Sequence, residues 1–235
     1  MNRLLTLSLN DFRVVFRDPM LRIFLFLPLL VITLVVWGVP FLFSVYPTAK
    51  DYDYVILMWA GLQTATMFGF ICGFVFLEEK DEQVFIALRV MPITAGTLIG
   101  VRLLLGVSIT LIVNILLFSL TQWVSMSWVQ IIVTAFQLAL LAPLLTLALV
   151  TFAQNKVEGL AQFKVYNLLA ILPTLIYFLP YSVLHGLAII PTYWTFRSIE
   201  AMDNGGPYLV YTGIGFVEYL IVLIGLGWFF EKRVF

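Results

Sequence analysis

Charged residues are scarce in this sequence. Lys, Arg, Asp and Glu together make up 11% of the 235 residues, whereas a soluble domain carries about 25%. A chain with so few charges cannot cover its own surface with polar groups in water. The formal net charge is zero, which argues against nucleic acid as a partner because that interaction needs a basic surface.

The sequence also lacks the motifs of common catalytic and metal sites. It contains no GxxxxGK[ST] phosphate-binding loop, no HExxH, no GxSxG and no CxxC. His185 is the single histidine, which excludes a zinc site of several imidazoles and is more typical of an interfacial residue. Cys72 is the single cysteine, so no internal disulfide can form. We therefore expect no enzyme acting by itself, and no cofactor or metal in this chain.

Long hydrophobic stretches dominate what remains. Hydrophobic residues account for 62% of the chain, and the mean hydropathy is +1.05. A helix that crosses the hydrocarbon core needs about 20 apolar residues. Six such stretches can be drawn: Pro19–Val45, Tyr54–Leu77, Leu98–Gln122, Trp128–Phe152, Val165–Leu184 and Pro207–Phe230. We predict an all-α integral membrane protein with one domain over residues 1–235, in which a six-span bundle follows residues 1–18.

Lysine and arginine are distributed unevenly between the two sides that six spans create. Both termini and the loops after spans 2 and 4 share one side, which receives all of the 13 basic residues except Lys50 and Arg197. Cytoplasmic loops carry the excess of Lys and Arg. The sequence therefore predicts a multi-pass protein of the cell membrane, inner or plasma, with both termini in the cytoplasm.

The first 18 residues have the pattern of a helix that lies in the membrane interface. Its apolar positions recur at helical spacing: Leu5, Leu9, Phe12 and Phe16. Arg13 and Arg17 share the opposite face, where they would contact lipid headgroups. An ordinary basic anchor before span 1 is the alternative. Asp18 and Pro19 then suit the cap and first turn of the next helix.

The segment after span 2 is acidic on the side where cations gather. It begins with Glu78, Glu79, Lys80 and Asp81. Farther along, Leu88 belongs to an apolar stripe and Pro92 ends the helical pattern. We interpret the segment as a short cytoplasmic coupling helix whose carboxylates dock on a partner, with a solvated loop as the alternative.

Prolines interrupt the chain between spans 5 and 6. Pro173 predicts a kink in span 5, Pro180 its end and Pro191 a new start. A short amphipathic helix follows and is stopped by Gly205 and Gly206. The sequence thus predicts a broken extracellular helical segment before span 6.

Glu218 is the one acidic group deep inside a span. It lies about ten residues, or about 15 Å by helical rise, from the outer end of span 6. Gln63 and Gln137 lie at similar distances from their outer ends, and Asn114 is slightly shallower. A lipid-facing carboxylate at that depth costs about 2.5–3.5 kcal/mol on insertion scales, so Glu218 should face protein or water. Two interpretations stay open: a polar tier lining a substrate path, or an interhelical hydrogen bond from Glu218 to one of the amides.

Gly69 and Gly73 form a pair of small residues one helical turn apart in span 2. Such a pair lets another helix approach closely. The partner could belong to a second protomer, but packing within one protomer is the interpretation we favour.

Taken in order, these segments resemble the membrane permeases of type-two ABC exporters. The resemblance rests on Arg17-Asp18-Pro19 before a span containing Pro28, the acidic stretch with Leu88 and Pro92, the segment from Asn155 to Lys164, and the broken segment before span 6. It covers nearly the whole chain and is nearest to short permeases of antibiotic or fluoroquinolone export systems.

The resemblance implies a division of labour between chains. A six-helix permease pairs with a second copy or a homologue, and separate ABC ATPase subunits bind ATP and magnesium beneath it. The interfacial helix and the helix after span 2 would receive the ATPase movement. A drug-like, lipidic or amphiphilic substrate would leave the cytoplasm or inner leaflet near spans 1 and 5, which would also form the seam between protomers.

Two other function classes remain open from the sequence. The first is a proton-coupled or channel-like transporter that uses Glu218, although proton relays usually need several ionisable groups in the spans. The second is a membrane scaffold or immunity protein that transports nothing.

Overall fold

The computed structural model describes residues 15–82, 95–121, 123–179 and 181–234. Every regular element in these ranges is a helix. The α-helices are α2 (Pro19–Thr33), α3 (Val39–Val45), α4 (Asp53–Asp81), α6 (Ala95–Leu120), α7 (Trp128–Ala139), α8 (Leu141–Phe152), α9 (Lys156–Ile171), α10 (Pro191–Asp203) and α11 (Tyr208–Val234). Between them lie the π-helix η1 (Leu34–Gly38) and the 3₁₀-helices η2 (Pro47–Tyr52), η3 (Leu172–Tyr177) and η4 (Ser182–Ile189).

Six helical stretches in the described part of the chain are long and apolar enough to cross a membrane. They are Pro19–Val45, Pro47–Asp81, Ile99–Leu120, Trp128–Phe152, Lys156–Tyr177 and Tyr208–Arg233. The prediction of an all-α protein with six spans is confirmed. The first and fourth stretches have the predicted bounds at both ends, and each begins directly after a capping residue, Asp18 or Ser127.

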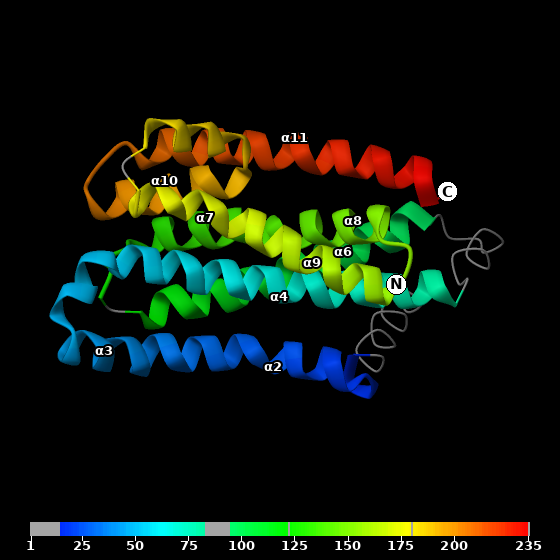
Figure 1. Cartoon of the computed structure of the whole chain (residues 1–235), viewed down its shortest axis with the longest axis horizontal. Helices are drawn as coiled ribbons and strands as arrows, with labels where there is room; N and C mark the ends of the chain where they lie inside the picture. Colours follow the sequence, from blue (N-terminus) through cyan, green and yellow to red (C-terminus); the bar gives the residue numbers. More distant parts are fainter. Residues whose placement is uncertain (1–14, 83–94, 122, 180, 235) are drawn as a thin grey trace.

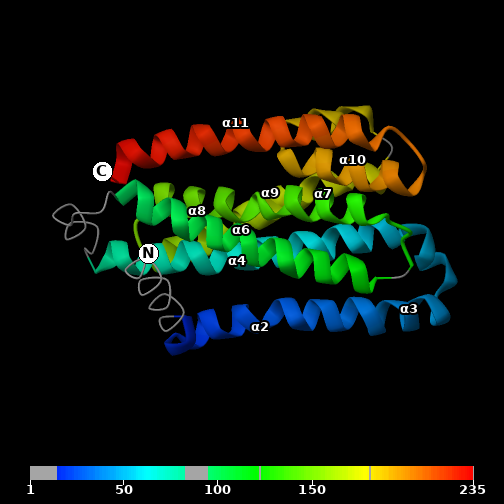
Figure 2. The same cartoon turned by 180° about the vertical axis from the view of Figure 1, so that it is seen from behind.

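Two spans form the centre of the bundle and four surround it. In the most apolar 18-residue part of each span, 72% of the residues are buried in span 2 and 78% in span 4, but only 17–28% are buried in the other four spans. In both views, α2 and α11 lie on opposite sides of this centre (Figures 1 and 2). The peripheral helices therefore present wide apolar faces outward, as lipid-facing helices do.

The central pair is held by close contact between α4 and α8. A side-chain carbon at Gly69 would lie 2.9 Å from the Ala142 carbonyl oxygen, and one at Gly73 would lie 2.8 Å from a methyl of Leu149. The Thr146 hydroxyl donates a hydrogen bond to the Gly69 carbonyl oxygen at 3.0 Å. The glycine pair thus packs within one protomer, which confirms the interpretation we favoured.

The bundle has two different ends, which Figure 1 separates along its long axis. At one, here called the terminal end, α2, α6 and α9 begin and α4, α8 and α11 finish. At the other, here called the α10 end, α10 lies beside the start of α11. Both ends of the described chain thus lie at the terminal end.

Two of the predicted span boundaries were wrong at the terminal end. The acidic residues Glu78 to Asp81 form the last turn of α4 rather than a loop after it. Span 5 begins at Lys156, earlier than the predicted Val165, because Asn155 caps α9 there and accepts a hydrogen bond from the Glu158 amide at 2.9 Å. Charged side chains can lie in these turns because the turns are at the end of the bundle.

The chain between spans 5 and 6 is broken, as predicted. The α-helix α9 gives way at Leu172 to η3, whose second residue is Pro173, and Pro191 begins α10. Gly205 takes a positive φ of 67° after α10 ends, a conformation that favours glycine. Pro180 lies outside the described residues.

Candidate functional site

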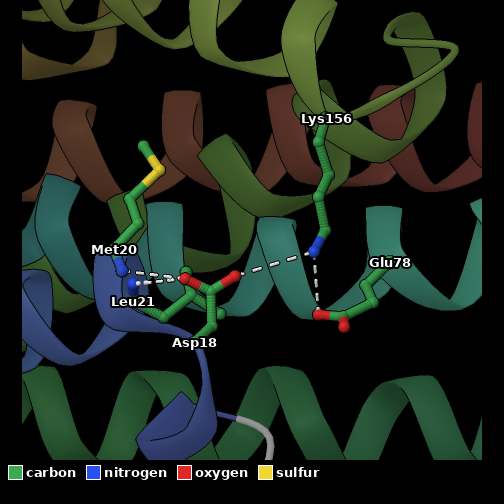
Figure 3. Close-up of polar contacts among 5 residues, drawn as sticks. All are labelled: Asp18, Met20, Leu21, Glu78 and Lys156. Carbon is green, nitrogen blue, oxygen red and sulfur yellow. Dashed lines mark hydrogen bonds and ion pairs between the residues drawn. The ribbon is translucent and has the colours of Figure 1, made fainter.

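Three helices meet in an ion cluster at the terminal end (Figure 3). The Lys156 ammonium of α9 lies 3.0 Å from Glu78 Oε2 on α4 and 3.7 Å from Asp18 Oδ2 at the start of α2. The other oxygen of Asp18 accepts the amide hydrogens of Met20 and Leu21, at 2.8 and 3.3 Å. Asp18 therefore caps α2 with one oxygen and contacts span 5 through the other.

The position of Lys156 is electrostatically costly without those carboxylates. It is the first residue of α9, and a cation at a helix N-terminus is opposed by the helix dipole. Asp18 and Glu78 offset that cost. The three side chains are about a third exposed (33%, 27% and 29%), so the cluster is partly shielded from water.

A second ion pair joins α4 to α6. The Arg102 guanidinium donates two hydrogen bonds to Glu79, at 2.5 and 2.6 Å, and lies 5.2 Å from the centre of the Phe76 ring. The side chain of Arg102 is 9% exposed and that of Glu79 is 18% exposed. Bidentate hydrogen bonds between an arginine and a carboxylate are strong and directional, and removing either partner here would leave a shielded charge unpaired.

The next residue of α4 reaches yet another span. The Lys80 ammonium donates to the carbonyl oxygens of Val150 and Ala153, at 3.2 and 2.8 Å. These carbonyls lie at the end of α8, where no further turn of helix supplies an amide hydrogen to them. Three consecutive residues at the end of α4 thus contact spans 5, 3 and 4.

The structure divides the predicted coupling residues into two groups. Glu78 and Glu79 are already paired within the chain, whereas Asp81 is exposed. Leu88 and Pro92 lie outside the described residues. The coupling role of all five residues, Glu78, Glu79, Asp81, Leu88 and Pro92, remains a prediction.

The predicted interfacial helix is described only at its end. Residues 15–17 are helical, and Phe16 and Arg17 are exposed. Arg13 lies outside the described residues, so the amphipathic helix also remains a prediction.

The residues of the predicted polar tier contact different helices. The Thr64 hydroxyl of α4 donates to Asn114 Oδ1 at 2.5 Å, while Gln137 donates through Nε2 to the carbonyl oxygen of Thr212 at 3.4 Å. Gln63 and Glu218 are each partly buried. Among the described residues, none of the four tier residues hydrogen-bonds to another, and the two interpretations of the tier, a substrate path or an interhelical hydrogen bond from Glu218, both remain predictions.

Comparison with known proteins identifies the family. The family described as "Fluoroquinolones export permease protein Rv2686c-like" matches residues 11–227. The chain belongs to this family. Two relatives from Mycobacterium tuberculosis are the fluoroquinolones export permease proteins MT2760 (strain CDC 1551 / Oshkosh) and Rv2686c (strain ATCC 25618 / H37Rv). Each is 27% identical over 212 residues, which cover 86% of this chain and 84% of the relative. No solved structure matches.

The structure also contains a polar ladder that the sequence analysis missed. Gln162 donates to Glu158 at 3.0 Å, and the Tyr166 hydroxyl donates to Gln162 at 3.2 Å. One turn separates successive members along α9, and all three are partly buried. The spacing of four residues is the signal for this ladder, but two of its members precede Val165, where the predicted span 5 began.

The α10 end of the permease is joined mainly by neutral groups. The Thr192 hydroxyl of α10 donates to the Ala170 carbonyl oxygen of α9 at 2.7 Å, and the hydroxyls of Ser198 and Thr212 lie 2.6 Å apart. Burial raises the pKa of the Tyr193 phenol, whose oxygen lies 2.8 Å from His185 Nδ1. Tyr193 therefore stays neutral where it meets the single histidine.

Proposed function

We propose that this protein is the membrane-spanning subunit of an ATP-driven exporter that moves a drug-like amphiphile out of the cytoplasm or inner leaflet. The observation that carries the proposal is the family match over residues 11–227, together with relatives named as fluoroquinolones export permeases. Fluoroquinolones are therefore the first cargo to test. Energy would come from a separate ABC ATPase, which binds ATP and magnesium, since this sequence has no phosphate-binding loop.

We place the ATPase contact at the end of α4 and in the segment that follows. The exposed carboxylate of Asp81 is available to a basic group on the ATPase, and Leu88 would enter a groove before Pro92 ends the coupling helix. Glu78 and Glu79 take a different part, because they already contact Lys156 and Arg102. They connect the coupling segment to the spans behind it.

The orientation and assembly belong to the same proposal. Of the described basic residues, only Lys50 and Arg197 belong to the segments at the α10 end, which supports a cytoplasmic terminal end in the cell membrane. A second copy or homologue would contact spans 1 and 5. Cysteine pairs placed from span 1 to span 5 should crosslink two protomers more readily than pairs from span 2 to span 2, whose Gly69 face is occupied by α8.

Two polar features are candidates for the cargo path. One is the ladder of Glu158, Gln162 and Tyr166 on span 5. The other is Glu218, which lies beside Trp194. Replacing Glu218 with Gln keeps the hydrogen-bonding atoms and removes the charge. Loss of export at normal expression and thermal stability would support a role in the path, whereas unchanged export would leave Glu218 as internal packing.

The deciding experiment is export with and without a working ATPase. The permease is expressed with the ATPase encoded beside it in a host that lacks its own efflux pumps, and accumulation of a fluoroquinolone is measured. Accumulation should fall only when the Walker lysine of that ATPase is intact. Export that survives loss of this lysine but stops when the proton gradient is collapsed would replace the proposal with a proton-coupled transporter. The absence of any export would favour a scaffold.

A further inference from the structure

We infer that Lys156 is a positioning residue for transport, which ties spans 1 and 5 to the end of α4 so that the three move together. The inference rests on the proposed function, since it concerns how movement at the end of α4 reaches the spans beside the cargo. Lys156 lies in the segment from Asn155 to Lys164 that carries part of the family resemblance, and the ion cluster gives it a specific task.

The first observation is the combination of partners. In the described part of the chain, Lys156 is the one cation paired with carboxylates from two other spans. Its partners are far apart in the sequence but meet at one nitrogen atom (Figure 3). Removing the ammonium would leave Asp18 and Glu78 facing each other, and like charges in a partly shielded place repel.

The second observation is how narrow the packed face of span 1 is. Only 17% of the residues in its most apolar 18-residue part are buried. Close to the ion cluster, Phe24 stacks on Phe70 with ring centroids 4.1 Å apart and meets the edge of Phe163 at 6.2 Å. Toward the α10 end, Trp37 and Phe41 are each 71% exposed. The terminal end of span 1 therefore packs on the core through one face, which includes the buried Leu21, and the Asp18–Lys156 pair is its electrostatic contact.

The third observation concerns the geometry of transmission. Glu78 lies one turn before the exposed end of α4 at Asp81, so a partner that displaces this end also displaces Glu78. Lys156 then follows its closer carboxylate and carries Asp18 with it. The Lys156 and Asp18 side chains, 33% and 27% exposed, are accessible enough to exchange partners during a transport cycle, whereas the Glu78 Oε2 that meets Lys156 is itself buried.

The test compares Lys156→Met with Lys164→Met, which removes the same charge from an exposed position of the same helix. Lys156→Arg restores the charge. Two readouts are taken on the full chain with its ATPase. One is fluoroquinolone accumulation in cells. The other is the yield of a bismaleimide crosslink within one chain, scored on the monomer band, between cysteines at Arg17 and Val157, the neighbours of Asp18 and Lys156, in a Cys72→Ala background.

We expect Lys156→Met to lower the export rate and the crosslink yield, each by about five- to tenfold, the lower end of a typical coupling between sites. Thermal stability should change little, Lys164→Met should match the parent, and Lys156→Arg should restore both readouts. Unchanged export with Lys156→Met would overturn the inference. So would a loss of export matched by lost folding in both Lys156→Met and Lys156→Arg, since that pattern describes a structural residue.

The two proposals fail in different ways. If the parent protein exports no fluoroquinolone with its ATPase, the proposed function fails, but the crosslink still reports whether Lys156 holds spans 1 and 5 together. If the parent exports and the crosslink does not depend on Lys156, the inference fails while the exporter stands.

Discussion

The two ends of the bundle are held together by different kinds of interaction. At the terminal end, ion pairs join separate spans: Lys156 connects α9 to α2 and α4, and Arg102 connects α6 to α4. At the α10 end, the ion pair between Arg197 and Glu200 stays within one helix. The contacts between elements there include hydroxyl hydrogen bonds and ring contacts, such as Tyr54 against Tyr177 at 5.4 Å, and Arg197 lies over the Tyr211 ring.

This difference suggests which end is built to move. Hydrogen bonds from buried hydroxyls have short reach, so small displacements break them. Charge pairs keep part of their attraction over longer separations and can exchange partners in water. An end joined by ion pairs can therefore shift while its helices stay associated, and the proposed ATPase contact lies at that end.

The largest effect that we expect concerns the two arginine pairs. Replacing Arg102 with Met should lower the free energy of unfolding by about 3–5 kcal/mol, because it leaves the shielded Glu79 carboxylate without its cation. Replacing Arg197 with Met should cost about 1 kcal/mol or less, because the pair is more exposed and Glu200 keeps the Tyr177 hydroxyl as a donor at 3.3 Å. Unfolding of the purified protein in lipid nanodiscs measures both.

The double variant Arg102→Met/Glu79→Gln serves as the control for this pair. Removing both charges should recover part of the loss, since the unpaired carboxylate is then gone. An equal or larger loss from Arg197→Met would break the comparison between the ends.

A smaller effect should mark the neutral contacts of the α10 end. Thr192→Val keeps the side-chain shape and removes the hydroxyl that donates to Ala170, at a site only 1% exposed. The expected loss is about 1 kcal/mol. Thr33→Val is the matched control, because the Thr33 hydroxyl is exposed and donates within its own helix at 2.9 Å. Equal losses in the two variants would show that the contact between α10 and α9 contributes nothing.

The smallest effect is a dependence on salt. Lys156→Met should cost no more than about 1 kcal/mol in 0.1 M salt, since its pairs are a third exposed. Raising the salt to 1 M shortens the screening length from about 10 to about 3 Å and should shrink that difference, whereas the loss from Thr192→Val should stay constant. A salt-independent Lys156→Met difference would mean that the ion cluster is more shielded than its exposure indicates.

The spans were predictable from the sequence because long apolar runs lie between polar residues. The charged end was harder. The segment from Lys156 to Lys164 has the polar composition of a loop, but Asn155 caps a helix that begins there. The pairing of Lys156 with Asp18 and Glu78 could not be read from a single sequence, because the fold alone brings these distant residues together.

The polar tier shows the opposite limitation. Depth along a helix placed Gln63, Asn114, Gln137 and Glu218 at similar levels, but depth says nothing about direction around the helix axis. Asn114 faces α4 and Gln137 faces α11, so residues at one level contact different neighbours. The glycine pair was easier, because one-turn spacing itself fixes a common face of the helix.

The length of α4 has a mechanical consequence. Its 29 residues measure about 43 Å by helical rise, which exceeds a hydrocarbon core of about 30 Å. Gly69 and Gly73 bring α4 into close contact with α8. Sliding of α4 along α8 would break this contact, whereas a tilt of α4 about it would not. It then acts as a lever with unequal arms: a sideways push on Asp81 swings the far end near Asp53 in the opposite direction by about twice the distance, because Asp53 lies farther along the helix from the glycines. A force applied at one membrane face would thus appear at the other without any helix changing its length or its fold.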